Sequence, residues 1–328
     1  MKNFFFAVLV ALLFACANPS RQAKLSGPYL GQALPGDAPV LFAPGVVSTG
    51  MYTRDLAMTP DGNEIYYCVV LGQFRYSAIM VTRQVNGVWT DPEVAPFSGH
   101  TDWMDLEPCI SHDGQHFYFM SNRPDTAAGD TSGGDEDIWV MDRQGDGWGE
   151  PYNLGAPVNS ENEEYFPSIT RDGTLYFTRQ TVGSPIGFIY RSRLVDGRYT
   201  KPVKLPEQVN SGRTQYNACV APDESYLIVP VWGREDSYGA TDYYIVYRDE
   251  QDNWSEPVHL DERVNSADRN EYSPYITHDG KFFFFMSGRD TGAQVPDRLT
   301  ADWIRHQYTS PGNGNPSIWW VSTEIFKE

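Results

Sequence analysis

Five stretches of the chain share one pattern of apolar and polar positions. Each contains a short run of alternating residues, an acidic turn, and a second, mostly apolar run. The five are LAMTPDGNEIYYCVV (56–70), EPCISHDGQHFYFMSNR (107–123), FPSITRDGTLYFTRQ (166–180), NACVAPDESYLIVPVWGR (217–234) and SPYITHDGKFFFFMSGR (273–289). Alternation with a period of two predicts β-strands, and the Asp-Gly kept in four copies predicts a tight hairpin turn between them.

A third apolar run and a fourth, Pro-containing run extend the repeat. The third runs are SAIMVTRQ (77–84), DIWVMDRQ (137–144), GFIYRSRL (187–194), DYYIVYRD (242–249) and SIWWVSTE (317–324). The fourth are WTDPEVAPFSG (89–99), WGEPYNLGAPVNS (148–160), YTKPVKLPEQVNS (199–211) and WSEPVHLDERVNS (254–266). Because proline has no N–H to donate, these fourth runs suit the outer edge of a sheet.

The spacing of the repeats indicates how the sheets are arranged. The turn aspartates Asp61, Asp113, Asp172, Asp223 and Asp279 are separated by 52, 59, 51 and 56 residues. A period of this length, filled with short strands and no helical pattern, predicts the blades of a β-propeller. We therefore predict an all-β, five-bladed propeller in one domain over residues 27–328, with six blades as the alternative.

The fifth repeat has no fourth run, and a matching segment stands at the other end of the chain. DAPVLFAPGVVST (37–49) has the Pro-Val-x-Phe start and the Val-Ser ending of a fourth run. We expect this N-terminal segment to pair beside 317–324 and to close the ring, since closure removes the free edges that an open array of sheets would expose.

The repeats resemble the TolB-type, WD-repeat-like propeller repeats of Gram-negative envelope proteins. The resemblance rests on W-x-x-P-x-x-L-x-x-x-V-N-S followed by [ST]-x-D-G-x-x-[YF]-F-x-S-x-R, which covers residues 89–289 almost continuously. Residues 129–179 are similar to the propellers that precede OmpA-type peptidoglycan-binding domains. The resemblance implies a propeller that serves as an interaction module, because such propellers share no single chemistry.

The chain starts with an apolar segment of signal-peptide length, MKNFFFAVLVALLFAC (1–16), which is too short to span a bilayer. Its end, Leu13-Phe14-Ala15-Cys16, resembles a bacterial lipobox. We therefore expect a signal peptide at 1–15 and a lipidated tether at 16–26 that begins with the acylated Cys16; ordinary secretory cleavage nearby is the alternative. Because no acidic run follows Cys16, we expect an outer membrane lipoprotein of a Gram-negative bacterium that faces the periplasm.

The charge and the cysteine count exclude several kinds of partner. A formal net charge of −18 argues against nucleic acid and against electrostatic binding to anionic lipid, so we expect membrane contact through the lipid anchor only. After Cys16 only Cys68, Cys109 and Cys219 remain. An odd number allows no complete disulfide framework, and we expect these three to be small buried apolar side chains. We expect a monomer.

The strand order predicts which face of the disc carries function. In a four-stranded blade, the connection into the inner strand and the connection between the second and third strands lie on one face, and the Asp-Gly turns lie on the other. The first face therefore receives the long segments 124–136 and 290–316. Long loops on a rigid scaffold are where binding sites usually form, so we expect the Asp-Gly face to be inert.

Near the axis of the loop-bearing face, we expect each inner strand to begin with a repeated polar residue and most second strands to end near a basic one. The polar residues are Asp55, Asp105, Glu164, Gln215 and Glu271, and the basic ones are Arg123, Arg179, Arg234 and Arg289. One hypothesis gives them architectural roles, with carboxylates that bond neighbouring blades and arginines that hold loops. The other is a polar funnel for an anionic or hydroxyl-rich ligand or a peptide, in which Asp55, Asp105, Glu164 and Glu271 are the candidates for acid and base.

Residues that break the repeat are further candidates for ligand binding. HTDWMD (100–105) places Trp103 just ahead of the second inner strand, and DRLTADWIRHQY (297–308) places Trp303, Arg305 and His306 in an insertion with helical spacing. Trp beside Arg and His is typical of a sugar- or peptide-binding rim. A loop that only packs its Trp against the disc would give the same pattern.

The sequence contains few motifs of established chemistry. No zinc-ligand spacing is present, so we predict no metal site, and calcium is a minor alternative at the acidic Gly-rich loop 129–137. No nucleophile elbow, phosphate loop or dinucleotide motif is present, so we expect no cofactor. The sequence favours a lipid-anchored envelope propeller that binds a protein or glycan partner. The alternative is a carbohydrate-active enzyme, a glycoside hydrolase or a polysaccharide lyase, that uses the axial carboxylates.

Overall fold

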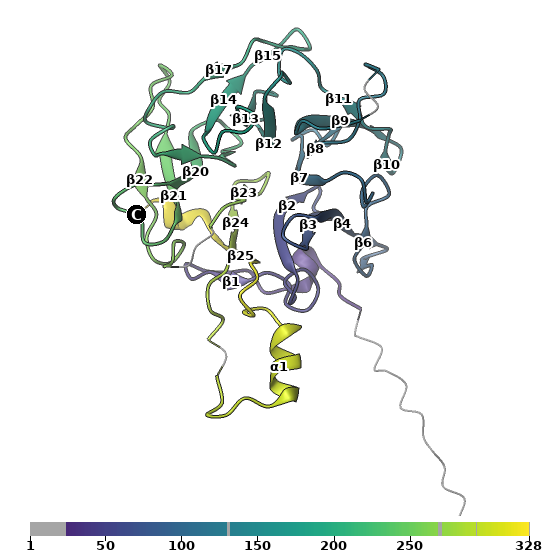
Figure 1. Cartoon of the computed structure of the whole chain (residues 1–328), viewed down its shortest axis with the longest axis vertical. Helices are drawn as coiled ribbons and strands as arrows, with labels where there is room; N and C mark the ends of the chain where they lie inside the picture. Colours follow the sequence, from purple (N-terminus) through teal and green to yellow (C-terminus); the bar gives the residue numbers. More distant parts are fainter. Residues whose placement is uncertain (1–23, 130–131, 268–270, 293, 328) are drawn as a thin grey trace, which may run out of the picture.

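The computed structural model describes residues 24–129, 132–267, 271–292 and 294–327. Within these residues, five antiparallel sheets of four or five strands surround a central axis as the blades of a propeller (Figure 1). The predicted five-bladed fold is confirmed and the six-bladed alternative is excluded. The expected signal peptide and the lipidated Cys16 lie outside the described residues. No helix in the described ranges has the length and apolar character needed to cross a membrane.

In blades 1 and 2 the strands run outward from the axis in chain order. Blade 1 contains β2 (Tyr52–Met58), β3 (Glu64–Leu71) and β4 (Tyr76–Val85), with the short strands β5 (Val88–Trp89) and β6 (Glu93–Val94) paired to β4. Blade 2 contains β7 (Asp105–Ile110), β8 (His116–Ser121) and β9 (Asp137–Gln144), with β10 (Gly147–Trp148) and β11 (Tyr152–Asn153) paired to β9.

Blades 3 and 4 repeat this order with small variations. Blade 3 contains β12 (Glu163–Ile169), β13 (Leu175–Gln180), β14 (Gly187–Ser192) and β17 (Val203–Lys204), and a separate ribbon of β15 (Leu194–Val195) and β16 (Arg198–Tyr199). In blade 4 the inner strand is split into β18 (Thr214–Gln215) and β19 (Cys219–Val220), which both pair with β20 (Tyr226–Trp232). β21 (Thr241–Tyr247) and β22 (Val258–His259) complete blade 4.

Blade 5 joins the two ends of the chain. It contains β23 (Tyr275–Ile276), β24 (Phe282–Ser287) and β25 (Ser317–Ser322), and its outer strand is β1 (Val40–Leu41) from the N-terminal segment. Val40 lies opposite Trp320 in the β1–β25 pair, and the Phe42 N–H donates to the Ile318 carbonyl at 2.9 Å. The predicted closure by residues 37–49 is confirmed, and Figure 1 shows the purple N-terminal strand beside yellow β25.

Aromatic packing reinforces this closure. Phe42 is fully buried, and its ring lies 5.0 Å from that of Phe284 and 5.3 Å from that of Trp320. The short 3-10 helix η1 (Pro28–Gly31) brings the ring of Tyr29 to 5.2 Å from Trp320. Burial of a side chain of this size stabilises a fold by about 2–3 kcal/mol, so the N-terminal segment is part of the core of blade 5.

The Val-Asn-Ser that ends the fourth runs of blades 2, 3 and 4 fastens these three outer connections to their own blades. The valines Val158, Val209 and Val264 are buried between blades. The asparagine that follows acts as a clamp on the third strand: Asn265 accepts from the Tyr243 N–H at 2.7 Å and donates to its carbonyl at 3.0 Å. Asn159 makes the same pair of bonds with Ile138. The motif therefore satisfies backbone groups that a short outer strand leaves unpaired.

The inner segment of every blade has one residue in the left-handed backbone region, two positions after its first polar residue, within the strand in blades 1 to 3 and beside the short strands in blades 4 and 5. These residues are Asp55 (φ 50°), Glu107 (φ 62°), Phe166 (φ 53°), Asn217 (φ 54°) and Ser273 (φ 65°). The strand pairing shifts across this position in blades 1 to 3, which marks a β-bulge. A bulge breaks the alternation of side chains, so two consecutive residues can face the axis.

The bulge also corrects the sequence alignment of blade 1. Asp55 was expected to begin its inner strand together with Asp105, Glu164, Gln215 and Glu271. Asp55 instead occupies the bulge position, and Thr53 stands where the other blades have their first polar residue. The spacing to the turn gives the same correspondence: Asp55 and Glu107 each stand six residues before the turn aspartate of their blade, whereas Asp105, Glu164, Gln215 and Glu271 each stand eight residues before it.

Candidate functional site

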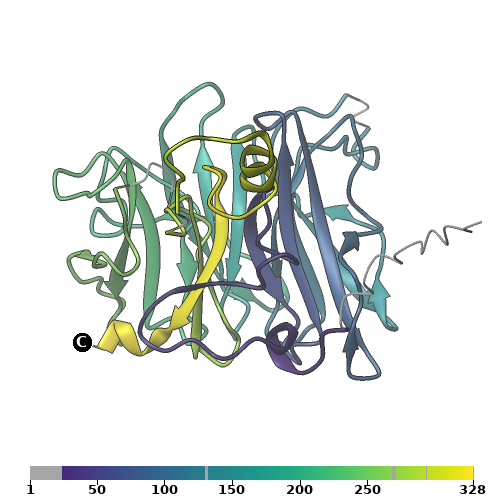
Figure 2. The same cartoon turned by 90° about the horizontal axis from the view of Figure 1, so that it is seen from below.

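The long connections of the blades lie on one face of the disc. Segment 290–316 carries the only α-helix among the described residues, α1 (Ala301–Tyr308). Figure 2 shows α1 at the upper face and the 3-10 helix η2 (Thr323–Lys327) at the lower one, where the Asp-Gly turns lie. The upper face is called the loop-bearing face below.

Three of the four predicted catalytic carboxylates hold loops in place. Asp105, Glu164 and Glu271 are fully buried. Glu164 accepts from the Ser160 N–H at 2.9 Å and from the Ser160 hydroxyl at 2.6 Å, and Glu271 accepts the same two bonds from Ser266 at 2.8 and 2.7 Å. These serines end the Val-Asn-Ser motifs, so the carboxylates fix the outer connections to the inner strands.

The repeated arginines and Gln215 complete these contacts. Arg123 lies 2.5 Å from Asp105, and Arg179 lies 2.5 Å from Glu164. The arginines also donate to carbonyls of the outer connections: Arg123 to Phe97, Arg179 to Val158 and Arg289 to Arg263. Arg234 differs, because it pairs with Asp236 at 3.0 Å, and Gln215 donates to the Gly187 carbonyl at 2.7 Å.

The predicted aromatic rim residues lie on two segments, with Trp103 just before β7 and the other three on α1. Trp103 stacks on His100 with ring centroids 3.6 Å apart, and it contacts Arg123. Trp303, Arg305 and His306 lie on α1, as the helical spacing indicated. Thr300 caps this helix through its hydroxyl, which accepts from the Trp303 N–H at 3.2 Å. None of its residues is buried, and Figure 1 shows α1 outside the ring of blades.

The C-terminal end of α1 is fixed to the segment that closes the ring. The Asn313 side chain donates to the carbonyls of Gly50 and Tyr308, both at 2.8 Å, and Asn315 donates to the Gly50 carbonyl at 2.9 Å. A Cβ on Gly50 would lie 2.5 Å from the Tyr308 carbonyl oxygen. The close approach of the two backbones therefore requires glycine at position 50.

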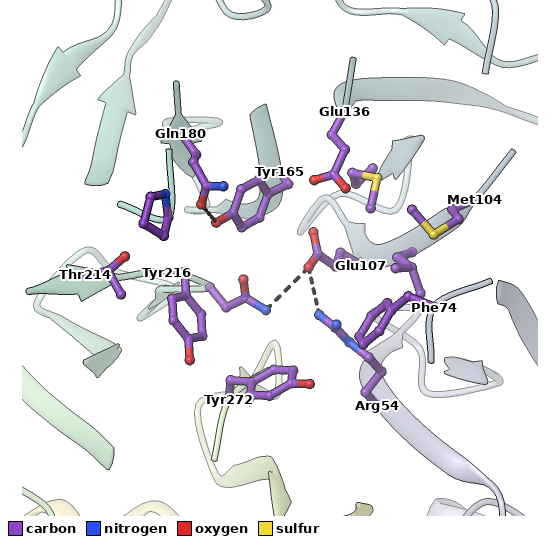
Figure 3. Close-up of a pocket in the computed structure, with 14 residues that line it drawn as sticks. Arg54, Phe74, Met104, Glu107, Glu136, Tyr165, Gln180, Thr214, Tyr216 and Tyr272 are labelled. Carbon is purple, nitrogen blue, oxygen red and sulfur yellow. Dashed lines mark hydrogen bonds and ion pairs between the residues drawn. The ribbon is translucent and has the colours of Figure 1, made fainter. Parts of the chain in front are cut away.

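A cavity of about 350 Å³ lies at the axis on the loop-bearing face (Figure 3). The inner strands or their bulges supply one charged or aromatic residue from each blade. These residues are Arg54, Glu107, Tyr165, Tyr216 and Tyr272. Leu106 beside Glu107, and Asn217 beside Tyr216, also line it, as expected where a bulge turns two consecutive side chains to the axis. None of the residues singled out as catalytic or ligand-binding from the sequence lines this cavity.

The centre of the site is a buried ion-pair network. Arg54 Nη2 lies 2.8 Å from Glu107 Oε1, and Arg54 Nε lies 2.6 Å from Asp55 Oδ2. The guanidinium also lies over the ring of Tyr272, 4.9 Å from its centroid. Breaking such a pair leaves an uncompensated buried charge, which costs about 3–5 kcal/mol.

Contacts from the remaining blades fix the two carboxylates. The Phe166 N–H of blade 3 donates to Glu107 at 2.7 Å, and the Asn217 amide of blade 4 donates to it at 3.4 Å. The Ser273 hydroxyl of blade 5 donates to Asp55. Burial raises the pKa of Glu107, while the neighbouring Arg54 opposes that rise. The network therefore connects all five blades at the axis.

Glu136 is the other acid that lines the cavity. It ends the segment 124–136, and its backbone carbonyl accepts from the Glu164 N–H at 2.6 Å. Burial and the charge of Glu163 raise the pKa of Glu136 to about 7, with Arg54 acting in the opposite direction. In the parts of the chain that the structure describes, no hydrogen bond or ion pair engages its carboxylate, so this group is available to a ligand.

Tyrosine rings form much of the cavity wall. Their hydroxyls are hydrogen-bonded to the protein: Tyr165 to Gln180 at 3.1 Å, Tyr216 with Thr241 at 2.7 Å, and Tyr272 with Tyr52. Figure 3 shows the three rings around the centre of the site, with Tyr272 beside Arg54 and with Tyr165 and Tyr216 further from it. Because the hydroxyls are already paired, the rings are held in place and offer mainly aromatic surface.

Sequence comparison of the repeats missed Arg54, Glu107 and Glu136. Arg54 breaks the repeat, since the other blades have leucine or tyrosine at its position, and an acid stands at the Glu107 position only in blades 1 and 2. The misplaced alignment of Asp55 hid both features. Glu136 was grouped with the acids of a Gly-rich loop. Among the described residues, no group of three or more His, Cys, Asp or Glu side chains is placed to hold a metal ion.

The opposite end of the axis is closed by two histidines. His112 and His278 precede the Asp-Gly turns of blades 2 and 5, and their Nδ1 atoms lie 2.9 Å apart. His278 Nε2 lies 2.9 Å from the Met58 carbonyl of blade 1, and His112 Nε2 lies 3.1 Å from the Ile169 carbonyl of blade 3. These contacts join four blades on the face that the sequence led us to regard as inert.

Comparisons with solved structures find distant likenesses to other propellers. TolB from Acinetobacter baumannii shares 16% identity with a TM-score of 0.46, over 84% of this chain and 55% of that one, so this chain spans about half of its length. The catalytic domain of a GH62 α-L-arabinofuranosidase from Coprinopsis cinerea shares 9% identity with a TM-score of 0.48, over 92% of this chain and 97% of that one. Neither a scan against protein-family models nor a search of curated proteins finds a match. The likenesses concern the fold alone.

Proposed function

We propose that this protein is a cell-envelope binding module that holds one sugar unit of a glycan in the axial cavity of its loop-bearing face. The observation that carries the proposal is the lining of this cavity, where tyrosine rings from three blades stand around an Arg54–Glu107 pair and the unengaged carboxylate of Glu136. The lipobox-like Leu13-Phe14-Ala15-Cys16 supports an attachment to the outer membrane through lipid at Cys16.

The size and chemistry of the cavity suit a sugar ring better than a protein surface. A volume of about 350 Å³ is at the lower end of the range for small-ligand pockets and far below a protein–protein interface. Sugar rings present C–H groups that pack on aromatic faces, and hydroxyls that bond carboxylates and amides. Tyr216 supplies a face of this kind, and Glu136 and Asn217 supply the polar groups.

A glycoside hydrolase is the second candidate, because two acids, Glu107 and Glu136, line the same cavity and both have raised pKa values. Hydrolysis needs a protonated acid and an ionised partner that is free to act on the sugar or on water. Glu136 fits the acid. Glu107 is engaged by Arg54, by a backbone N–H and by Asn217, which favours a binding role over a catalytic one.

A glycan array followed by calorimetry tests the proposal. We expect the wild-type protein to bind a defined set of glycans, and Tyr216→Ala and Glu136→Gln each to weaken binding about tenfold or more. Tyr308→Ala is the matched control, because Tyr308 is 77% exposed on α1. Melting curves establish that each variant is folded.

Three outcomes would count against the proposal. Glycan binding that is unaffected by Tyr216→Ala and Glu136→Gln would remove the axial cavity as the site. Capture of an envelope protein by the wild type, lost in Glu136→Gln while no glycan binds, would show a protein partner instead. Cleavage of a bound glycan that Glu136→Gln abolishes would favour the hydrolase.

A further inference from the structure

The charges around the axial cavity do not balance. Arg54 is the one cationic side chain that lines it within the described residues, and it is already paired with Asp55 at 2.6 Å and with Glu107 at 2.8 Å. Glu136 adds a third carboxylate without an ion-pair partner in the described chain. With its acids ionised, the site therefore carries more negative than positive charge.

A neighbouring acid adds to the excess of negative charge around Glu136. Glu163 of β12 lies close enough for its charge to disfavour ionisation of Glu136, and the charge of Glu136 in turn disfavours ionisation of Glu107. Glu163 itself is held by the Gln180 amide at 3.0 Å, which brings no positive charge. Arg54 is the one group near Glu136 that acts in the opposite direction. A ligand that brings a positive charge to this point would relieve the repulsion.

The aromatic wall adds a second attraction for a cation. Ring faces attract ammonium groups, and the interaction strengthens where water is excluded. The ring of Tyr272 is already covered by the Arg54 guanidinium, whereas no cation lies over the rings of Tyr165 and Tyr216 in the described residues. Two uncovered rings and one unpaired carboxylate thus border the same cavity.

We propose that the axial cavity selects a sugar that carries a protonated amine, with Glu136 as its counter-ion and the rings of Tyr165 and Tyr216 beside the ammonium group. This inference rests on the proposed function, because it names which sugars the cavity takes. The ion pairs of Arg54 with Asp55 and Glu107 stay intact, and the ligand amine forms an ion pair with Glu136.

A matched series of methyl glycosides isolates the effect of charge. For glucose, galactose and mannose, the substituent on carbon 5 is an aminomethyl, a hydroxymethyl or a carboxylate group, so that only one substituent changes. Binding is measured by calorimetry at pH 8, where Glu136 is ionised and an alkyl amine stays protonated. We expect the amine to bind about tenfold more tightly than the neutral sugar in at least one ring series, and the acid to bind most weakly.

The variants assign the preference to Glu136. Glu136→Gln keeps the shape of the side chain and should remove most of the preference for the amine over the neutral sugar. Glu161→Gln is the control, because Glu161 is an exposed acid just before β12 that does not line the cavity. It should leave the preference unchanged.

The outcomes separate this inference from the proposed function. A neutral or acidic sugar that binds as tightly as the amine would overturn the inference and leave the sugar site intact. No binding by any member of the three series would overturn the proposed function and the inference with it. Tighter binding of Nα-acetyl-lysine amide than of every amino sugar would also overturn both, because it would indicate a peptide ligand.

Discussion

The Nδ1 atoms of His112 and His278 lie 2.9 Å apart and join blades 2 and 5 at the Asp-Gly end of the propeller axis. Because each Nε2 faces a backbone carbonyl, each Nε2 carries a proton, and the two Nδ1 atoms can share at most one more. A second proton there would place two cations in contact at a largely buried site.

This pair predicts a loss of stability in mild acid. Burial lowers the pKa of His112 to about 4 and also lowers that of His278, whereas an unfolded histidine titrates near 6.5. As the pH falls below about 6.5, the unfolded chain takes up protons that the folded protein does not, so the free energy of unfolding falls. Allowing for partial exposure, we expect the pair to contribute about 1–2 kcal/mol to this loss.

Melting temperatures at pH 7.5 and pH 5 measure the effect. His112→Gln should show a smaller drop between the two values than the wild type, because one of the titrating groups is gone. His306→Gln on the exposed helix α1 serves as the control and should behave like the wild type. An equal drop in all three proteins would mean that the histidine pair does not set the acid sensitivity.

Phe42 should be essential for the closure of the ring. Phe42→Ala removes a fully buried ring that packs on Phe284 and Trp320, and we expect it to lower the free energy of unfolding by about 3–5 kcal/mol. Val40→Ala in the same strand changes a side chain that is 38% exposed and should cost about 1 kcal/mol or less. Chemical denaturation compares the two, and similar losses would argue against closure by packing.

Gly50 should control the position of α1 without controlling the fold. In Gly50→Ala the new methyl group would overlap the Tyr308 carbonyl, so the anchor through Asn313 and Asn315 should loosen. We expect limited proteolysis to cut segment 290–316 several times faster, with a small change in melting temperature. Gly36→Ala is the matched control, since no atom lies within 4 Å of the Cβ it would add.

Asn265 should stabilise blade 4 more than its place in a connecting segment suggests. Asn265→Ala would leave the N–H and carbonyl of Tyr243 and the carbonyl of Leu260 without this partner in a fully buried site. We expect a loss of about 2–3 kcal/mol in denaturant unfolding. Asn253→Ala, whose side chain bonds Asp249 in an exposed turn, should cost far less. Comparable losses would show that the Asn clamp contributes little.

The architecture could be predicted from the sequence because each blade must bury both of its faces. That requirement repeats the alternation of apolar residues and the turn chemistry five times, and even the closing strand carries the pattern of the fourth run it replaces. Val40 and Phe42 were recognisable for this reason.

The cavity could not be predicted in the same way, because a bulge leaves no distinct mark in the alternation. The bulge turns two consecutive side chains toward the axis, which simple alternation does not predict. The alignment of Asp55 with Asp105 was a separate error, because Asp55 stands six residues before its turn aspartate, as Glu107 does, and Asp105 stands eight before. The sequence also does not show which polar residues are already hydrogen-bonded within the fold. Asp105 and Glu164 resemble site residues in the sequence, but in the structure serine and arginine side chains donate to both carboxylates.

The repeated bulge has a consequence for how this scaffold can change. Each inner strand presents neighbouring side chains at the bulge, such as Arg54-Asp55 and Tyr216-Asn217, while the flanking residues fill the spaces between sheets. Arg54-Asp55 also belongs to the ion-pair network that connects the blades, whereas the rings of Tyr165 and Tyr216 line the cavity without an ion-pair role. Randomising the two tyrosine positions, with Arg54, Asp55 and Glu107 kept, should therefore yield receptors with new specificities on the same fold.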